Sequence, residues 1–246
     1  MGMILFNGVS SRDHGVIIEE YPELNHGARR GEAYQVAGRN GTFYAEDGTY
    51  DNYVQAYKIA VREGLHRRAD LRASDLASWL LVPSGFCRLE DSFEPEYFKM
   101  ARFAGPLNIA QIMGRYGRST LEFDCLPERW LKTGEREHEL TNNQFITNPT
   151  PFPSKPIIKI KRTGTINIRV NNDLFMSITE QTNTVIIDCE AETIKTADGT
   201  DLYNSTIFYH SYADFPTLQP GVNTVDNTRG SQDTFKLTVI PRWYVL

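Results

Sequence analysis

The sequence has little cysteine, and its cysteines follow no pattern of a metal site or a disulfide framework. Cys87, Cys125 and Cys189 are the only three in 246 residues, and none belongs to a CxxC motif or has a histidine close by. An odd number of widely spaced thiols argues against paired disulfides, and the missing Cys and His clusters argue against zinc. We therefore expect a chain that folds in a reducing cytoplasm without a bound metal.

Long hydrophobic runs are also missing. The longest, LASWLLV at residues 76–82, is far shorter than the roughly 20 residues that a membrane helix requires. The opening MGMILFNGVS has no basic leader, and Phe6 stands where a myristoylation signal requires Ser or Thr. We therefore expect no secretion, no lipid anchor and no membrane insertion.

The chain lacks a block of like charge. It has 26 basic and 31 acidic side chains and a net charge of −5, and its densest basic stretch, HRRADLR at residues 66–72, is interrupted by Asp70. Strong nucleic-acid binding needs clustered Lys and Arg, so this class of protein is disfavoured. With 40% hydrophobic and 23% charged residues, the composition is that of an ordinary globular protein.

Motifs of the common enzyme classes are absent. The sequence has no GxSxG and no HExxH, and the glycines of AGRNGTF, residues 37–43, do not fit a phosphate-binding loop. The histidines are scattered singly, and each reads as a surface or core residue. They are His14, His26, His66, His138 and His210.

One acidic pair remains as a catalytic candidate. In DCE, Asp188 and Glu190 would lie on one face of a strand, about 7 Å apart. Inverting glycosidases separate their two carboxyl groups by roughly 6.5–9.5 Å. Two acids on the solvent face of an alternating strand are the more ordinary explanation. We therefore predict that the chain is not an enzyme and has no catalytic residue, cofactor or metal.

A group of aromatic residues in the second half admits two interpretations. They could stack on sugars, as on a lectin surface, or they could fill a core, and we expect most of them to be core. Asn204 begins an NST glycosylation acceptor that has no use without secretion. The aromatic residues are Tyr203, Phe208, Tyr209, Tyr212 and Phe215.

The first half has the pattern of an α+β domain, mostly β with one helix. YVQAYKIAVR, residues 53–62, alternates apolar and polar side chains and predicts a half-buried strand. A helix is predicted after it, with Ser74 as the N-cap and with Leu76, Trp79 and Leu80 on its inner face. Further strands are predicted in FCRLEDSF, EPEYFKMARFAG and STLEFDCL.

The polar stretch KTGEREHELTNN, residues 132–143, divides the chain. Hydrophobic periodicity stops there and charge takes over, which is typical of a linker. We therefore predict two domains, residues 1–137 and residues 138–246.

The second half has the pattern of a β-sandwich or jelly roll. PIIKIKRTGTINIRV predicts two alternating strands around a turn at Gly164, with Ile166, Ile168 and Val170 facing the core. Several more short strands follow, separated by turn signals.

The segment FPTLQPGVNTV, residues 215–225, predicts a sharp corner in this half. Pro220 suits the second place of a type II turn, and Gly221 suits the third, where φ is positive. We expect Leu218 to be buried before the corner and Val222 to continue the core after it.

The order of these features resembles that of the distal tail proteins of phages with long, flexible, non-contractile tails. FNGVSSRDHGVII is similar to the opening strand and loop of that family, and VAGRNGTFYAEDGTYDNYVQAYKI is similar to its glycine-tipped hairpin and the long strand after it. The resemblance extends over nearly the whole chain. Later segments that carry it are LASWLLVPSGFCRLEDSFEPEYFKMARF, TLEFDCLPERWLKTG, NPTPFPSKPIIKI, IIDCEAETIK, FPTLQPGVNTV and IPRWYVL.

The resemblance implies a tail-tube-like, ring-forming first domain and a galectin-like β-sandwich as the second. Six copies would form a ring that joins the tail tube to the tail-tip hub or a tail-associated lysin-type protein, with a lumen for DNA. Tape-measure and receptor-binding proteins would be further partners, and the protein would reside in the virion tail tip after assembly in the host cytoplasm. A carbohydrate-binding jelly-roll module and, less favoured, a glycoside hydrolase stay as alternatives.

The hairpin tip is the one candidate interaction site. Residues at the tip of a hairpin have little core of their own, so their natural use is to pair or pack across a subunit boundary. The candidate interface residues are Gly38, Arg39, Asn40 and Gly41.

Overall fold

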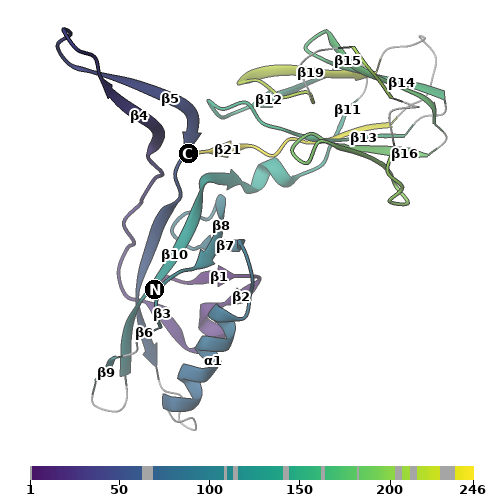
Figure 1. The fold of residues 1–246 in the computed structure, drawn as a ribbon. Helices are drawn as coiled ribbons and strands as arrows, with labels where there is room; N and C mark the ends of the chain where they lie inside the picture. The colour runs from purple at the N-terminus through teal and green to yellow at the C-terminus, as the bar shows by residue number, and fades with distance from the viewer. Residues whose placement is uncertain are drawn as a thin grey trace. The chain divides into compact units, whose positions relative to one another are not determined.

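The chain forms two compact units in the computed structural model, Met1–Arg129 together with Leu246, and Trp130–Val245. It is mostly β with one α-helix among the described residues, as the sequence predicts (Figure 1). The predicted boundary after residue 137 falls inside the second unit. The structure describes residues 2–62, 69–107, 110–112, 116–140, 144–161, 164–181, 183–202, 207–210, 215–227 and 236–246.

The first unit is built on one large sheet. Its strands follow the order β2-β1-β7-β8-β10-β6-β3, and β9 pairs with β10. Tyr53, Tyr57 and Ile59 are buried on one face of β6, as the alternation predicts. The strands are β1 (Ile4–Phe6), β2 (Val9–Ser10), β3 (Val16–Ile18), β6 (Tyr53–Arg62), β7 (Cys87–Asp91), β8 (Tyr97–Phe103), β9 (Ala110–Ile112) and β10 (Tyr116–Leu131), and a short 3-10 helix, η1, spans Ser11–His14.

Helix α1 (Ala69–Leu81) packs on this sheet through its predicted apolar face, all of which is buried. The Trp79 indole N–H donates to the carbonyl of Phe6 at 3.2 Å, which fixes the helix to β1. The predicted N-cap is wrong, because Ser74 lies inside the helix. Residues 71–73, Leu-Arg-Ala, favour helix and extend it toward the N-terminus beyond the serine.

Four charged residues form a cluster inside the first unit, which we call the buried charge cluster. Lys99 Nζ lies 3.4 Å from Asp91 Oδ2 and 2.7 Å from Glu94 Oε2, and Arg129 Nη1 lies 2.5 Å from Glu94 Oε1. The side chains of Asp91 and Lys99 are 2% and 3% exposed. Tyr57 donates its hydroxyl to Asp91 at 2.8 Å, and burial together with this carboxylate holds the pKa of Tyr57 well above its ordinary value. Periodicity in the sequence did not predict this cluster.

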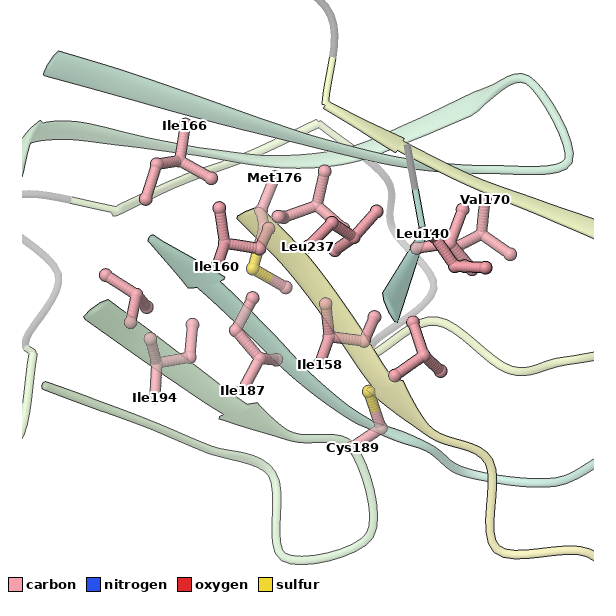
Figure 2. Close-up of a cluster of buried hydrophobic side chains, with 14 of the residues drawn as sticks. Leu140, Ile158, Ile160, Ile166, Val170, Met176, Ile187, Cys189, Ile194 and Leu237 are labelled. Carbon is pink, nitrogen blue, oxygen red and sulfur yellow. The ribbon is translucent and has the colours of Figure 1, made fainter. Parts of the chain in front are cut away.

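The second unit is a sandwich of two five-stranded sheets, as predicted. One has the order β11-β20-β13-β16-β17 and the other β12-β19-β14-β15-β18. Figure 2 shows the aliphatic core, to which both sheets contribute, for example Ile158 and Ile187 from the first and Ile166 and Met176 from the second. The elements are η2 (Lys132–Glu135), β11 (His138–Leu140), β12 (Phe145–Asn148), β13 (Ile157–Lys161), β14 (Gly164–Val170), β15 (Asp173–Gln181), β16 (Thr184–Asp188), β17 (Thr193–Thr196), β18 (Ile207–Tyr209), β19 (Gly221–Asn227), β20 (Lys236–Ile240) and β21 (Tyr244–Val245).

Gly164, where the sequence predicts a turn, is the first residue of β14, and the strands on its two sides belong to different sheets. β13 pairs with β16 and β20, whereas β14 pairs with β15 and β19. Gly164 has φ of +99°, a conformation that glycine adopts without a steric penalty. Ile166, Ile168 and Val170 are all buried, as the alternation predicts.

The linker predicted at residues 132–143 is wrong over its described part. Lys132–Glu135 forms η2, and Leu140 of β11 is buried in the sandwich core. Gly134 packs so closely on Trp243 that a Cβ would lie 2.4 Å from the Trp243 backbone nitrogen. The stretch has a high content of charged side chains, yet its backbone is packed, so its composition alone does not predict its structure. Residues 141–143 lie outside the described residues.

The structure confirms the turn predicted at residues 215–225 and the burial of Leu218, but the predicted burial of Val222 is wrong. Leu218 is buried and Gly221 has φ of +86°, but Val222 is 65% exposed. The residue that points inward is Asn223, which is fully buried. Its Nδ2 donates to the carbonyls of Gln219 at 2.7 Å and Gly221 at 2.9 Å, and its Oδ1 accepts from the Gln219 N–H at 2.8 Å. An amide that satisfies the corner's backbone groups thus replaces the predicted hydrophobic contact.

Candidate interaction site

The predicted glycine-tipped hairpin forms a two-stranded sheet of its own, which we call the arm. Its strands are β4 (Arg29–Gln35) and β5 (Thr42–Tyr50), shown in Figure 1. Among the described residues neither strand pairs with a third one, so the backbone groups on both edges of the arm are open to a partner. A two-stranded sheet by itself is marginally stable in water. This geometry is typical of an element that packs against another surface.

The four residues selected from the sequence lie at the tip of the arm. Gly38 and Gly41 have φ of +81° and +87°, and the N–H of Arg39 donates to the Val36 carbonyl at 3.1 Å. Gly38 to Gly41 are all exposed, and a Cβ added to either glycine would meet no atom within 4 Å. The glycines are therefore required by the positive φ angles of the turn rather than by crowding.

The arm also exposes large apolar side chains that the sequence analysis did not select. Tyr34 and Phe43 are 47% and 53% exposed and are direct partners across the two strands, so they share one face. We call them the aromatic pair. Tyr44, on the opposite face, is 46% exposed, and Val36 near the tip is 49% exposed. Apolar residues grouped in this way mark interaction surfaces.

Polar contacts set the register at the base of the arm. Arg29 Nη1 lies 2.6 Å from Glu46 Oε2, and the Tyr44 hydroxyl donates to the Arg29 carbonyl at 3.2 Å. The hydrogen bond with Glu46 raises the pKa of Arg29, and hydrogen bonds from the Thr49 hydroxyl and N–H lower the pKa of Asp47. These pairs are exposed, so each adds little to stability. Their effect is to orient the arm's strands rather than to build a site for chemistry.

The candidate acidic pair is not a pair in the structure. Asp188 ends β16, and its Oδ1 accepts the backbone N–H groups of Glu190 at 3.0 Å and Ala191 at 3.1 Å, which caps the following turn. Arg242 binds the same carboxylate through two contacts, Nη1 to Oδ1 at 2.7 Å and Nη2 to Oδ2 at 2.9 Å. Glu190 instead points to Lys155, 3.7 Å away. Both carboxylate oxygens of Asp188 are therefore engaged in contacts that hold the turn and Arg242 in place.

Asp188→Asn should lower the free energy of unfolding by roughly 1–3 kcal/mol, because it removes charge-assisted hydrogen bonds that are only partly exposed. Partial burial opposes ionisation of Asp188, but the bonds from Arg242 and from the Ala191 and Glu190 N–H groups outweigh it and lower the pKa below the ordinary 3.8. This stabilisation is therefore complete above pH 3.8 and is lost as the pH falls through the lower pKa of the folded state. Urea unfolding at pH 7 and at pH 3 measures it.

The matched control is Glu190→Gln, whose side chain is 56% exposed and should change stability by no more than about 0.5 kcal/mol. The difference between wild type and Asp188→Asn should shrink at the lower pH. A difference that stays constant with pH would contradict the ion pair as its cause.

The other chemistry-bearing residues form no assembled site among the described residues. No group of three His, Cys, Asp or Glu side chains there could hold a metal. Burial raises the pKa of Cys125 and of Cys189 to about 12, so neither thiol is prepared to act as a nucleophile. His14 lies 2.9 Å from Asp75 and stacks on Trp79, a packing role. His66 and Asn204 lie outside the described residues, and no described helix is long and apolar enough to span a membrane.

The aromatic residues of the second half do not all enter the core. Phe208 and Tyr209 are 63% and 44% exposed, whereas Phe215 is partly buried against the core cluster. The expectation of a mostly buried group is thus wrong for the two residues of β18. Tyr203 and Tyr212 lie outside the described residues.

Comparison with known proteins identifies the fold. The crystal structure of the SPP1 Dit (gp 19.1) protein matches with a TM-score of 0.72 over 100% of both chains, at 15% sequence identity. It is described as a paradigm of the hub adsorption apparatus in phages that infect Gram-positive bacteria. A chain of the phage p2 baseplate, in its activated conformation with Sr, matches with a TM-score of 0.50 at 10% identity, over 97% of this chain and 96% of that one. No family model matches the sequence, and no curated protein does.

The chain therefore has the fold of a phage distal tail protein, and the resemblance drawn from its sequence is confirmed at the level of the fold. The match includes both units, since it covers the whole of each chain. At this identity the likeness establishes architecture, and function requires a separate argument.

Proposed function

We propose that this chain is a structural component of a phage tail tip. The observation that carries the proposal is the full-length match to SPP1 Dit, which extends over both units and leaves no part of either chain unmatched. The contacts of Asp188 further support a structural rather than an enzymatic role, because they remove the only catalytic candidate that the sequence offered.

On this proposal six copies form a closed ring that connects the tail tube to the tail-tip hub. Homo-oligomers favour closed point-group symmetry, and a lumen at the centre of the ring would let DNA pass. The net charge of −5 suits a passage that must release polyphosphate rather than hold it. Tube, hub or lysin-type, tape-measure and receptor-binding proteins are the proposed partners, in a virion tail tip assembled in the host cytoplasm.

Within the ring we assign subunit contacts to the first unit and peripheral contacts to the second. The arm supports this division, since its open edges, its tip at Gly38 to Gly41 and its aromatic pair all belong to the first unit. The second unit is a sandwich with a core of its own, which suits a module that meets peripheral tail proteins. The galectin-like character expected of this sandwich is part of the proposal.

The full chain should assemble into particles of six copies, 6 × 28.0 = 168 kDa. Mass photometry and light scattering over a range of concentrations measure this mass directly. A protein that stays at 28.0 kDa at high concentration, and that forms no ring in virions, would contradict the proposal.

A further inference from the structure

The outer face of the sandwich sheet that contains β14, β15 and β18 carries an unusual row of side chains. Asn167 pairs in register with Ser177, and Ser177 pairs with Phe208, so the three residues lie side by side on one face across three strands. Their neighbours along the strands, Ile168 and Met176, point into the core, which places this row on the outer side.

Hydrogen bonds hold the polar members of the row in fixed orientations. The Ser177 hydroxyl donates to Asn167 Oδ1 at 2.6 Å, and Ser177 Oγ lies 2.7 Å from His210 Nε2. The single hydroxyl hydrogen is committed to Asn167, so Nε2 of His210 must be the nitrogen that carries a hydrogen and donates. In the neutral ring Nδ1 is then a hydrogen-bond acceptor. The side chains are ordered in advance, which reduces the entropy that a ligand would have to overcome.

An exposed aromatic ring stands directly beside this network. Phe208 is 63% exposed, and its ring centroid lies 4.6 Å from that of His210 at an interplanar angle of 69°. The edge-to-face contact holds the phenyl ring while leaving most of its surface in water. A flat apolar surface next to directional polar groups suits a ligand that has an apolar side and hydroxyl groups at its rim.

The charges on this face select against an ionic ligand. Arg169 lies two residues beyond Asn167 on the same face, and its register partner on β19 is Asp226. The formal charges of these two described residues cancel, so together they supply neither the surplus of cations that a phosphate or nucleic acid requires nor a surplus of anions.

We propose that Asn167, Ser177, Phe208 and His210 form a binding site for a neutral saccharide. A pyranose ring would stack its C–H face on Phe208 and would exchange hydrogen bonds between its hydroxyls and the side chain of His210, while Asn167, which is only 9% exposed, would hold Ser177 in place behind them. This site would give the sandwich an adhesive activity of its own. The inference does not depend on ring formation, and a monomeric protein would test it equally well.

Protein-detected NMR on the full chain tests the site, with methyl β-galactoside, methyl β-glucoside, N-acetylglucosamine and glucuronate as probes. At least one neutral sugar should shift the resonances of the four site residues, with a dissociation constant in the millimolar range, since so small a surface makes few contacts. Phe208→Ala should weaken binding about tenfold or more, and Phe208→Tyr, which keeps the ring, should retain it.

Phe145→Ala is the matched control, because Phe145 is 67% exposed on β12 at the other edge of the same sheet. It should leave sugar binding unchanged. Three results would each overturn the proposal: no shifts with any neutral sugar, equal weakening by Phe208→Ala and Phe145→Ala, or a preference for glucuronate over the neutral sugars.

Discussion

Lys99→Met should lower the free energy of unfolding of the first unit by about 3–5 kcal/mol, the cost of leaving a buried charge without its partner. Lys99 Nζ lies within salt-bridge distance of both Asp91 and Glu94, and its side chain is 3% exposed, so water cannot readily replace it. Methionine is unbranched like lysine and only one side-chain heavy atom shorter. The loss would therefore come mainly from the missing charge and its contacts with Asp91 and Glu94.

Urea unfolding followed by circular dichroism would give the size of the effect, and hydrogen exchange would locate it. Amides of β7, β8 and β10 should lose protection, while those of the sandwich should keep it, since the cluster lies within the first unit. Exposed Lys58, 2.7 Å from Glu20, supplies the control: Lys58→Met should cost less than about 1 kcal/mol. Equal losses for the two variants would show that burial does not set the cost.

The cluster also connects to the end of the chain. Arg129 Nη2 donates to the carbonyl of Leu246 at 3.0 Å, so Leu246 is grouped with the first unit although the residues before it belong to the second. Both residues of this contact belong to the first unit, although the second unit, Trp130–Val245, separates them in the sequence. A fragment that ends at Arg129 lacks Leu246 and therefore loses this hydrogen bond, so the first unit expressed alone should be somewhat less stable than in the full chain.

Sequence patterns predicted the elements whose one face is buried against a single core. The alternation in β6 and β14 and the apolar face of α1 each reflect local periodicity, and each is confirmed. Lys99 could not be predicted in this way, because strand alternation contains no information on the charge that another strand will bring beside it. Asp91 becomes its neighbour only through the order of β7 and β8 in the sheet.

The missed parts of the candidate site have similar causes. Tyr34 and Phe43 read as ordinary strand residues, because aromatic residues favour strands whether they face a core or a partner. Only the separation of the arm from the other sheets shows that they are exposed. The sequence shows only that Asp188 is close to Glu190. Its structural role depends on Arg242, which is distant in the sequence and which the fold brings to the same turn.

The arm is the element on which the proposed ring should depend most. Tyr34→Ser together with Phe43→Ser should abolish the 168 kDa species, that is 6 × 28.0 kDa, and leave a 28.0 kDa monomer. Aromatic residues at the centre of an interface often cost 2 kcal/mol or more when removed, and in a closed ring the loss recurs at every contact. Folding should be nearly unaffected, because a cross-strand aromatic pair adds only about 0.2–1 kcal/mol. Mass photometry and a thermal melt measure the two effects separately.

Phe145→Ser provides the control for this experiment, since Phe145 is as exposed as the aromatic pair but lies in the second unit. It should leave the ring intact if subunit contacts come from the first unit. If the double variant of the arm still forms hexamers, the role proposed for the aromatic pair is contradicted, but the proposal of a hexameric ring is not. Loss of the ring with Phe145→Ser and not with the arm variant would move the subunit contacts to the sandwich. In that case Gly38 to Gly41 and the strands behind them would be free to contact the next protein along the tail instead of the next copy in the ring.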